Sequence, residues 1–324
     1  MKGKFLTAIA GLALVASASA FGEAYPTKTI TMVVPFSAGG PTDTVARLVA
    51  QSMSTTLKQT VIVENVGGAG GTIGAARVAK ADPDGYTLLL HHIGMSTAPT
   101  LYRKLSFNPV TDFAPVGLIT DVPMTFIARR DFPAKDLKEL LAYVKANKDK
   151  VSYANAGVGS ASHLCGMLFM TAINTELTTV PYKGTGPAMN DLLGSQVDFM
   201  CDQTTNTTSQ IKSGKVKVYA VTTKTRVPSL ANVPTMNEAG VPGFEVAVWH
   251  GLYAPKGTPD AIVNKLSAAL QAALKDPTVK QRFADLGTEP VSQDRATPEA
   301  LRTHLKSEIA KWAPIIKKAG IYAD

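Results

Sequence analysis

Cysteine is scarce in this chain of 324 residues, which carries only Cys165 and Cys201. Two cysteines cannot build a disulfide scaffold, and a chain of this length buries a core large enough to fold without one. Because no pattern in the sequence places the two Cα atoms within bridging range, we predict two buried free thiols, with a single bridge as the alternative. No cysteine follows the apolar N-terminal run, so the chain has no acceptor for an N-terminal lipid.

The motifs of several enzyme and metal-binding classes are also missing. With five histidines and no His-Glu-x-x-His or Cys-x-x-Cys pattern, we predict no metal site and no cofactor. The chain has no glycine-rich loop ending in Gly-Lys-Ser/Thr, which excludes hydrolysis of nucleoside triphosphates, and no Gly-x-Ser-x-Gly nucleophile elbow. We therefore expect a protein that is not an enzyme.

Positive charge is present but not concentrated in any segment. The 33 basic and 25 acidic residues give a formal charge of +8, which favours anionic partners. The lysines and arginines are scattered, without the basic patch interleaved with aromatic residues that nucleic-acid binding uses. We predict no nucleic-acid partner.

Apolar runs of membrane-spanning length are absent as well. At the N-terminus two lysines precede an apolar run over 5–16, and 18–20 has the small-x-small pattern of a signal-peptidase site. This run is shorter than the roughly 20 residues of a spanning helix. We predict a signal peptide over 1–20, with a second cleavage site after 24, and a soluble periplasmic product that meets a membrane only through protein partners.

Short apolar, β-branched runs alternate with amphipathic segments of helical length. This alternation predicts an α/β fold in which each lobe is a mostly parallel sheet flanked by helices. The predicted strands lie at 29–34, 61–63, 86–90, 124–128, 151–154, 178–180, 197–200, 216–221 and 246–254. The predicted helices lie at about 42–57, 72–80, 137–147, 160–173, 187–193, 259–274, 277–286 and 298–318.

The strands are too many for one compact domain, and the helical tail must pack on a lobe that is already formed. We predict a discontinuous lobe one, from 25 to 122 plus 249 to 324, and a lobe two from 123 to 248. The chain then crosses twice, near Pro123 and near Trp249, which makes a hinge. Ligands of open α/β sheets bind at the carboxyl ends of strands, here in a cleft between the lobes.

A glycine-bearing loop joins the first predicted strand to a helix at 34–43. Its backbone N–H groups, its hydroxyl groups and the N-terminus of the helix favour a carboxylate ligand. The candidate contacts are Ser37, Ala38, Gly39, Gly40 and Thr42. The alternative is an ordinary turn in which Asp43 caps the helix.

A loop of the same design follows the predicted strand at 151–154, with Gly157, Gly159, Ser160, Ser162 and His163 as candidates. Two facing helix N-termini could hold both ends of a dicarboxylate, or one carboxylate and one polar group. We expect His163 to cap or pack in the first helical turn. The alternative is an exported hydrolase or transferase that uses Ser160 or Cys165 with His163.

Other polar residues lie at predicted strand ends. His91 and His92 close the third strand, and alternation directs one of them toward the cleft. For the glycine run at 67–71 we predict tight packing of a helix on the sheet, in preference to a third anion loop. Further candidates follow strands of lobe two, where a solvated loop is the alternative: Tyr182, Lys183 and Asp202.

Ordered motifs at consistent spacing run through the chain beyond the predicted signal peptide. They read Tyr25-Pro26-x-Lys28-x-Ile30, Val34-Pro35-Phe36, Gly39-Gly40-x-x-Asp43, Val63-Glu64-Asn65, Ala81-Asp82-Pro83-Asp84-Gly85-Tyr86, Pro181-Tyr182-Lys183-Gly184 and Val233-Pro234-Thr235. With these motifs the chain resembles the Bug family, the solute receptors of tripartite tricarboxylate transporters. The resemblance implies a two-lobed periplasmic-binding-protein fold, similar to type II, that closes on a carboxylate held by backbone groups and bridging water.

The resemblance also implies contacts residue by residue. Asp43 stands at the position that in some members meets an amino or amide group of the ligand. Val66-Gly67 replaces the Arg-Pro pair that often follows Glu-Asn in the family, a departure that affects the shape of that loop. His91-His92 and Cys201-Asp202-Gln203-Thr204-Thr205 stand where members vary, which predicts that these positions tune ligand choice. The implied contacts are Phe36, Ser37, Ala38, Gly39, Gly40, Asp43, Gly157, Gly159, Ser160, Ser162 and His163.

The ligand and partners follow from the resemblance only by class. A di- or tricarboxylate, an aromatic acid and an amino acid all satisfy loops of this kind. The expected partners are the subunits of a membrane transporter, served by a receptor that is a monomer. A sensor that reports the ligand to a signalling partner is the alternative that shares the same cleft.

Overall fold

The structure, a computed structural model, describes residues 25–323. The predicted signal peptide over 1–20 and the second cleavage site after 24 lie outside the described residues. The chain first forms β1 (Ile30–Val34), α1 (Pro41–Leu57), β2 (Val61–Asn65), the 3-10 helix η1 (Ala69–Gly71), α2 (Thr72–Ala79), β3 (Thr87–His92), α3 (Gly94–Leu101) and the long strand β4 (Phe113–Arg129).

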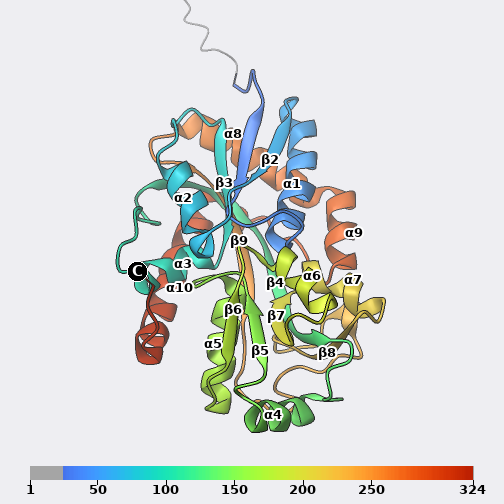
Figure 1. Ribbon diagram of the computed structural model, residues 1–324. Helices are drawn as coiled ribbons and strands as arrows, with labels where there is room; N and C mark the ends of the chain where they lie inside the picture. The colour runs from blue at the N-terminus through green and yellow to red at the C-terminus, as the bar shows by residue number, and fades with distance from the viewer. Residues whose placement is uncertain (1–24, 324) are drawn as a thin grey trace, which may run out of the picture.

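A second group of elements follows β4 and forms the lower part of the molecule in Figure 1. These are α4 (Leu137–Ala146), β5 (Ser152–Asn155), α5 (Ala161–Ile173), β6 (Thr178–Pro181), α6 (Thr185–Leu193), β7 (Phe199–Gln203), α7 (Thr204–Lys212), β8 (Val216–Val221) and the 3-10 helix η2 (Pro228–Leu230). The chain then returns to the upper part through β9 (Ala247–Pro255), α8 (Asp260–Lys275), α9 (Pro277–Asp285) and α10 (Pro298–Ala319).

Each lobe is built on a sheet in which a single described strand runs against the others. In lobe one the order is β2-β1-β3-β9-β4, where β1 pairs parallel with β2 and β3, and β9 pairs antiparallel with β3 and β4. In lobe two β5 pairs parallel with β6 and β7, and β4 pairs antiparallel with β7 and β8. The predicted α/β fold with mostly parallel sheets is confirmed, with β9 and β4 as the exceptions.

Strand β4 belongs to both sheets. Its residues up to Pro123 pair with β9, and from Met124 onward it pairs with β7 and β8. Figure 1 shows β4 and β9 running between the two lobes. The two sheets are therefore joined by one continuous strand.

The helices cover the sheets because their apolar residues recur with helical spacing. In α1, Val45, Val49 and Met53 lie one turn apart and are fully buried. Helix α10 begins at Pro298, the predicted start, with Thr297 as its cap, whose hydroxyl accepts from Ala300 N. None of the helices formed by residues 25–323 is both long and apolar enough to cross a membrane.

The prediction of two free thiols is wrong, because Cys165 and Cys201 form a disulfide. Helix α5 packs on strand β7, and this packing brings the two Cα atoms to 6.2 Å although 36 positions separate them in sequence. The bond lies in the buried core of lobe two. Sequence reasoning missed it because the packing of a helix on a later strand is a tertiary contact.

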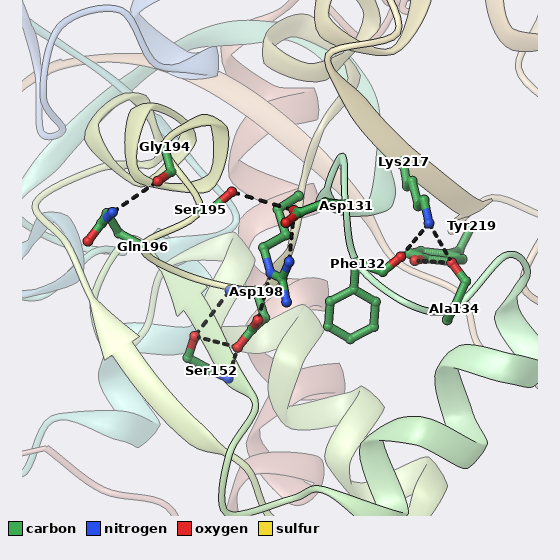
Figure 2. A network of polar contacts seen from close by, with 11 residues as sticks. Asp131, Phe132, Ala134, Ser152, Gly194, Ser195, Gln196, Asp198, Lys217 and Tyr219 are labelled. Carbon is green, nitrogen blue, oxygen red and sulfur yellow. Dashed lines mark hydrogen bonds and ion pairs between the residues drawn. The ribbon is translucent and has the colours of Figure 1, made fainter.

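A polar network ties the strands of lobe two together at their far ends, away from lobe one (Figure 2). The Asp198 carboxylate accepts from Ser152 N at 2.8 Å and from Arg129 Nε at 2.9 Å. Arg129 closes β4, Ser152 opens β5, and Asp198 immediately precedes β7. One carboxylate therefore joins three neighbouring strands of lobe two.

Candidate functional site

A small cavity lies between the two lobes at the ends of their strands. Its lining consists of Phe36, Gly40, Pro41, Thr42 and His92 from lobe one, and of Ala156, Ser160, Ala161, Ser162, Thr185, Asp202 and Gln203 from lobe two. It encloses about 270 Å³ that no atom fills, part of which is open to solvent. Most of that space is too narrow for a water molecule, so the lobes are drawn together around it.

The N-terminus of α1 forms one wall. Gly40 is its N-cap and supplies no side-chain cap, and Pro41 has no N–H group. The N–H groups of the first helical turn after Pro41 therefore have no side-chain partner from the cap. They leave a site of partial positive charge at the cavity.

Asp43 lies behind this wall and not in it. Its Oδ2 accepts from Gly39 N at 3.0 Å and from Arg47 Nε at 2.9 Å, and its Oδ1 accepts from Asn65 Nδ2 at 2.9 Å. Burial opposes ionisation, but the hydrogen bonds from Arg47, Gly39 and Asn65 outweigh it and lower the pKa of the carboxyl. Asp43 therefore holds the loop in shape, and its oxygens face away from the ligand space.

Three histidines of lobe one pack together beneath the cavity. The His92 ring stacks on Phe36 with centroids 4.6 Å apart, and it also contacts His91 and His250. Burial lowers the pKa of His91 to about 3 and of His250 to about 4, and it holds the pKa of His92 well below its usual range. The cluster is therefore neutral at physiological pH.

His92 is the histidine that reaches the cavity. Its Nδ1 accepts from Gly94 N at 3.0 Å, so the hydrogen of the neutral ring lies on Nε2. The alternation predicted for this strand end places His92 in the lining and leaves His91 out of it. Lobe one thus offers the cavity an uncharged N–H donor.

The first turn of α5 forms the facing wall. Ser160, and not His163, is the N-cap, and its Oγ accepts from His163 N. Ser162 Oγ accepts from Ala156 N at 2.8 Å and lies 3.2 Å from Ser160 Oγ. One hydroxyl hydrogen joins the two serines, so the other hydroxyl hydrogen of the pair is left for the cavity.

The end of β7 completes the lining with an acidic residue. Asp202 Oδ1 accepts from Thr185 Oγ1 at 2.9 Å, and Oδ2 accepts from Asn206 Nδ2 at 2.6 Å. Burial raises the pKa of the Asp202 carboxyl to about 6, although these hydrogen bonds oppose the shift. Gln203 follows as the N-cap of α7, without a side-chain cap bond.

The N-termini of α1, α5, α6 and α7 therefore all open on the same cavity, because Gly40, Ser160, Thr185 and Gln203 all line it. The lining contains no lysine or arginine. A helix N-terminus carries about half a positive charge and free N–H groups. Such convergence suits a small anion held by backbone groups.

The structure brings only part of the predicted set together in the lining. Residues predicted from sequence that line the cavity are Phe36, Gly40, Thr42, His92, Ser160, Ser162 and Asp202. Predicted residues that lie outside the lining are Ser37, Ala38, Gly39, Asp43, Gly157, Gly159, His163, Tyr182 and Lys183. Sequence reasoning did not select Pro41, Ala156, Ala161, Thr185 and Gln203 as contacts, although Gln203 lies in the segment 201–205 that was expected to tune ligand choice. Most of these five lie where a predicted strand or loop passes into a helix.

Several predicted residues outside the lining instead join the lobes. Ser37 N donates to Lys183 O at 2.9 Å, and Thr97 Oγ1 donates to Gly159 O at 3.1 Å. The Lys183 side chain itself is exposed. Tyr182 is turned away, with its hydroxyl donating to Asp191 Oδ2.

The glycine run at 67–71 has an interlobe role that the sequence did not predict. A Cβ on Gly70 would lie 1.8 Å from Val158 O, and one on Gly67 would lie 2.8 Å from Lys183 O. The Tyr102 hydroxyl also donates to Val158 O at 2.7 Å. These glycines permit the loops of lobe two to approach, while Gly71 packs on the sheet as predicted, against His91.

The structure does not pair Ser160 or Cys165 with the His163 ring, as the hydrolase or transferase alternative requires. Cys165 is in the disulfide, and the His163 ring accepts through Nδ1 from Gly159 N at 3.4 Å, with Ser160 Oγ bonded to the His163 backbone. Within residues 25–323 no group of three or more His, Cys, Asp or Glu side chains is placed to hold a metal ion.

Comparison with known proteins places this geometry in a family. The model of the "Tripartite tricarboxylate transporter family receptor" matches residues 45–321. A protein of Agrobacterium vitis named for the TAR-I ttuE-ttuC' intergenic region is 53% identical over 320 residues, which is 99% of this chain and 92% of that protein.

Two solved structures are close in fold and sequence. The periplasmic binding protein BugD is 58% identical, with a TM-score of 0.91 over 93% of this chain and 100% of its own. MatC of Rhodopseudomonas palustris, solved with bound malate, is 44% identical, with a TM-score of 0.88 over 90% of this chain and 100% of its own. The predicted two-lobed periplasmic-binding-protein fold is thereby confirmed. The chain belongs to the family of tripartite tricarboxylate transporter receptors, as its resemblance to Bug proteins predicted.

Proposed function

We propose that this protein captures a small organic carboxylate in the interlobe cavity and delivers it to a tripartite tricarboxylate-type membrane transporter. The observation that carries the proposal is the convergence of four helix N-termini, those of α1, α5, α6 and α7, on one cavity. The solved relative MatC, which holds malate, supports the same ligand class.

The chemistry of the lining favours an anion that is released again. Backbone N–H groups and the neutral His92 N–H donate to a carboxylate, and no lysine or arginine of the lining adds a full charge. Holding an anion by partial charges avoids a buried ion pair, which would be difficult to break when the ligand is passed on. A receptor needs this reversibility, whereas an enzyme would need a reactive group.

Capture requires the lobes to move, since the cavity is too narrow to admit a ligand from outside. We propose a hinge near Pro123 and Trp249, with lobe one at 25–122 plus 249–324 and lobe two at 123–248. The partner change of β4 after Pro123 supports this division. The ligand then shifts the lobes toward the closed state by its greater affinity for that state.

The same proposal covers the location, the oligomeric state and the partners of the protein. We propose that residues 1–20 are removed on export, that the protein acts as a monomer in the periplasm, and that the transporter subunits recognise its closed form. The apolar N-terminal run and the likeness to a periplasmic binding protein support this placement. The proposal assigns the protein no catalytic residue, cofactor or metal.

The test is a binding screen on the mature protein, expressed without residues 1–24 and stripped of ligand by unfolding and refolding. The panel contains mono-, di- and tricarboxylates, aromatic acids and acidic amino acids, with the uncharged diol of matched length as control. A ligand at about 100 times its dissociation constant adds roughly 2.7 kcal/mol of stability, which appears as a higher melting temperature. Failure of every carboxylate to bind, or conversion of a bound one into product, would overturn the proposal.

A further inference from the structure

One acidic side chain lines the cavity in which we propose that an anion is held. Asp202 lies at the end of β7 and is nearly enclosed, with an exposed fraction of 1%. Among the lining residues, all of which the structure describes, it has the only acidic side chain, and none is a lysine or an arginine. A bound carboxylate therefore shares an enclosed site with a carboxyl of the protein.

The groups of lobe two that pack around Asp202 carry no charge. Its Oδ1 accepts from Thr185 Oγ1 of α6, and its Oδ2 accepts from Asn206 Nδ2 of α7. Across the sheet, its partner on β4 is Thr125. Tyr153 of β5 interacts with it as well, and burial raises the pKa of that hydroxyl, which keeps its proton. Lobe two thus gives the carboxyl hydrogen bonds, while these neighbours supply no positive charge.

The ionisable groups on the other walls do not supply a positive charge to the cavity at pH 7 either. The histidine cluster of lobe one reaches the lining through His92, and burial lowers the pKa of all three rings. In α5, burial lowers the pKa of His163 to about 4. Arg47 of α1 lies outside the lining and is paired with Asp43. These groups therefore leave the negative charge of Asp202 without a cationic partner in the site.

Two carboxylates that share such a site repel each other, and a proton on one of them removes the repulsion. A neighbouring like charge disfavours the ionised form of a carboxyl, and the effect is strong where water is excluded. Burial already raises the pKa of Asp202 to about 6, and a bound carboxylate raises it further. The ligand is the weaker competitor for the proton, because the N–H groups of the helix N-termini favour its ionised form.

Building on the function proposed above, we propose that the receptor binds its carboxylate together with one proton, which is held on the Asp202 carboxyl. The proton comes from solvent when the lobes close on the ligand and returns to solvent when the ligand leaves. Protonation also gives Asp202 an O–H donor in place of its charge. Affinity then decreases as the pH rises, because the free protein becomes ionised at Asp202 and must take up the proton in order to bind.

The test counts the protons that are taken up on binding. Calorimetry of malate binding to the ligand-stripped mature protein is repeated at pH 7 in buffers with different ionisation enthalpies, which gives the number of protons per ligand. We expect roughly 0.5–1 proton to be taken up. We also expect the dissociation constant to rise about tenfold or more from pH 6 to pH 8, a range over which the carboxyls of the ligand are already ionised.

Substitution of Asp202 tests the assignment to a residue. Asp202→Asn keeps the shape of the side chain, and the Asn206 amide can rotate to present its oxygen to the new NH₂ group. We expect this variant to take up no proton at pH 7 and its dissociation constant to change by about twofold or less between pH 6 and pH 8. Asp202→Ser is a second variant, in case the new amide disturbs folding.

Asp191→Asn is the matched control. Asp191 is a carboxylate of α6 in the same lobe, where its Oδ2 accepts from the Tyr182 hydroxyl, and it lies outside the cavity lining. The control variant should keep both the proton uptake and the pH dependence of the natural protein.

The outcomes separate this proposal from the function beneath it. Binding of malate without proton uptake, and with the same affinity at pH 6 and pH 8, overturns the proton proposal and leaves the carboxylate receptor standing. Proton uptake that survives in the Asp202 variants places the proton on another group, such as His92, and overturns the role of Asp202. If malate does not bind, the tightest ligand of the carboxylate panel takes its place in the same measurements. If no acid of that panel binds, the receptor function falls, and this proposal falls with it.

Discussion

The two walls of the cavity differ in the ionisable side chains that are buried in them. On the side of lobe one, His91, His92 and His250 form a neutral cluster whose pKa values are lowered by burial. On the side of lobe two, Asp202 is a carboxyl whose pKa burial raises to about 6, and it sits next to a disulfide-bonded cysteine. Lobe one presents an uncharged donor, and lobe two presents acceptors within a cross-linked wall.

This contrast separates two tasks of one site. Reversible binding of an anion needs hydrogen-bond donors that carry no full charge, and neutral histidines and helix N-termini provide them. Selection among anions needs groups that penalise the wrong substituent, and buried acceptors provide those. The helix N-termini lie on both lobes, but the neutral histidine cluster lies on lobe one and the buried Asp202 carboxyl on lobe two, so substitutions of these side chains should have different signatures.

Acid should destabilise the protein through its buried histidines, three of which form the cluster of lobe one. The folded-state pKa values of the three histidines lie below the unfolded value near 6.5, so their contribution is present above that pH and is lost as pH falls toward about 4. Each histidine lowers the free energy of unfolding by up to about 1.4 kcal/mol per pH unit, and three together by roughly 4. Urea unfolding between pH 7 and 4.5 measures this slope.

A matched variant makes the acid prediction sharper. His91→Gln removes one of the three groups, so its slope should be lower by about one proton. A slope in the natural protein of less than one proton per molecule would contradict the assignment of neutral, buried histidines.

Loss of the disulfide should weaken lobe two next most strongly. Breaking a link that closes a loop of 36 positions should lower the free energy of unfolding by roughly 4 kcal/mol in the chain-entropy model. The paired substitution Cys165→Ala and Cys201→Ala, compared with the natural protein under oxidising and reducing conditions, measures it. Reduction should bring the natural protein to the stability of the variant, and an unchanged stability under reduction would show that the bond does not form.

Asp202 should respond to pH in the opposite direction to the histidines. Its folded-state pKa is raised, so its contribution is fully present below pH about 4 and is lost as pH rises through about 6. The stability of Asp202→Asn relative to the natural protein should therefore increase by up to about 3 kcal/mol between pH 4 and 8. A difference that stays constant with pH would show that the carboxyl is not protonated on burial.

The smallest expected effect tests closure between the lobes. Gly70→Ala places a Cβ 1.8 Å from Val158 O in the closed structure, and we expect it to weaken carboxylate binding about tenfold or more, a loss of roughly 1.4 kcal/mol. Calorimetry and small-angle scattering with saturating malate measure affinity and closure.

Gly214→Ala is the control for backbone strain in this experiment. Gly214 has nearly the same φ, +65° against +60° for Gly70, but a Cβ there meets nothing within 4 Å. Both variants should lose roughly 1–2 kcal/mol of stability from the left-handed backbone, and only Gly70→Ala should lose affinity. Equal affinity in the two variants would contradict the closed contact.

The fold could be predicted because its signals are local. Alternation of apolar strands with amphipathic helices requires only the periodicity of neighbouring residues, and the Thr297-Pro298 pair marks a helix start within two positions. The site was predicted where a loop passes into a helix, which found Gly40, Ser160 and Ser162 in the lining. The same rule would have found Thr185 and Gln203 had it been applied to every strand end.

The predicted contacts that lie outside the cavity lining have side chains whose direction depends on residues far away in the sequence. Asp43 turns to Asn65, 22 positions away, and Lys183 contributes its backbone oxygen to Ser37 of the other lobe. Neither contact has a local signature, since each forms only when strands from separate parts of the chain are assembled. The lobe boundaries and the hinge stay a prediction.

The sequence by itself determined the class of fold, the family and most of the helices and strands, because these depend on spacing along the chain. Helices α3 and α7 and the first half of β4 were not predicted. Only the tertiary structure decided which N-termini share a cavity, that Cys165 meets Cys201, and that Gln203 Oε1 is left without a donor. The physical reason is that burial and hydrogen-bond satisfaction are properties of the assembled molecule, in which the partners of a polar group come from elements far apart in sequence.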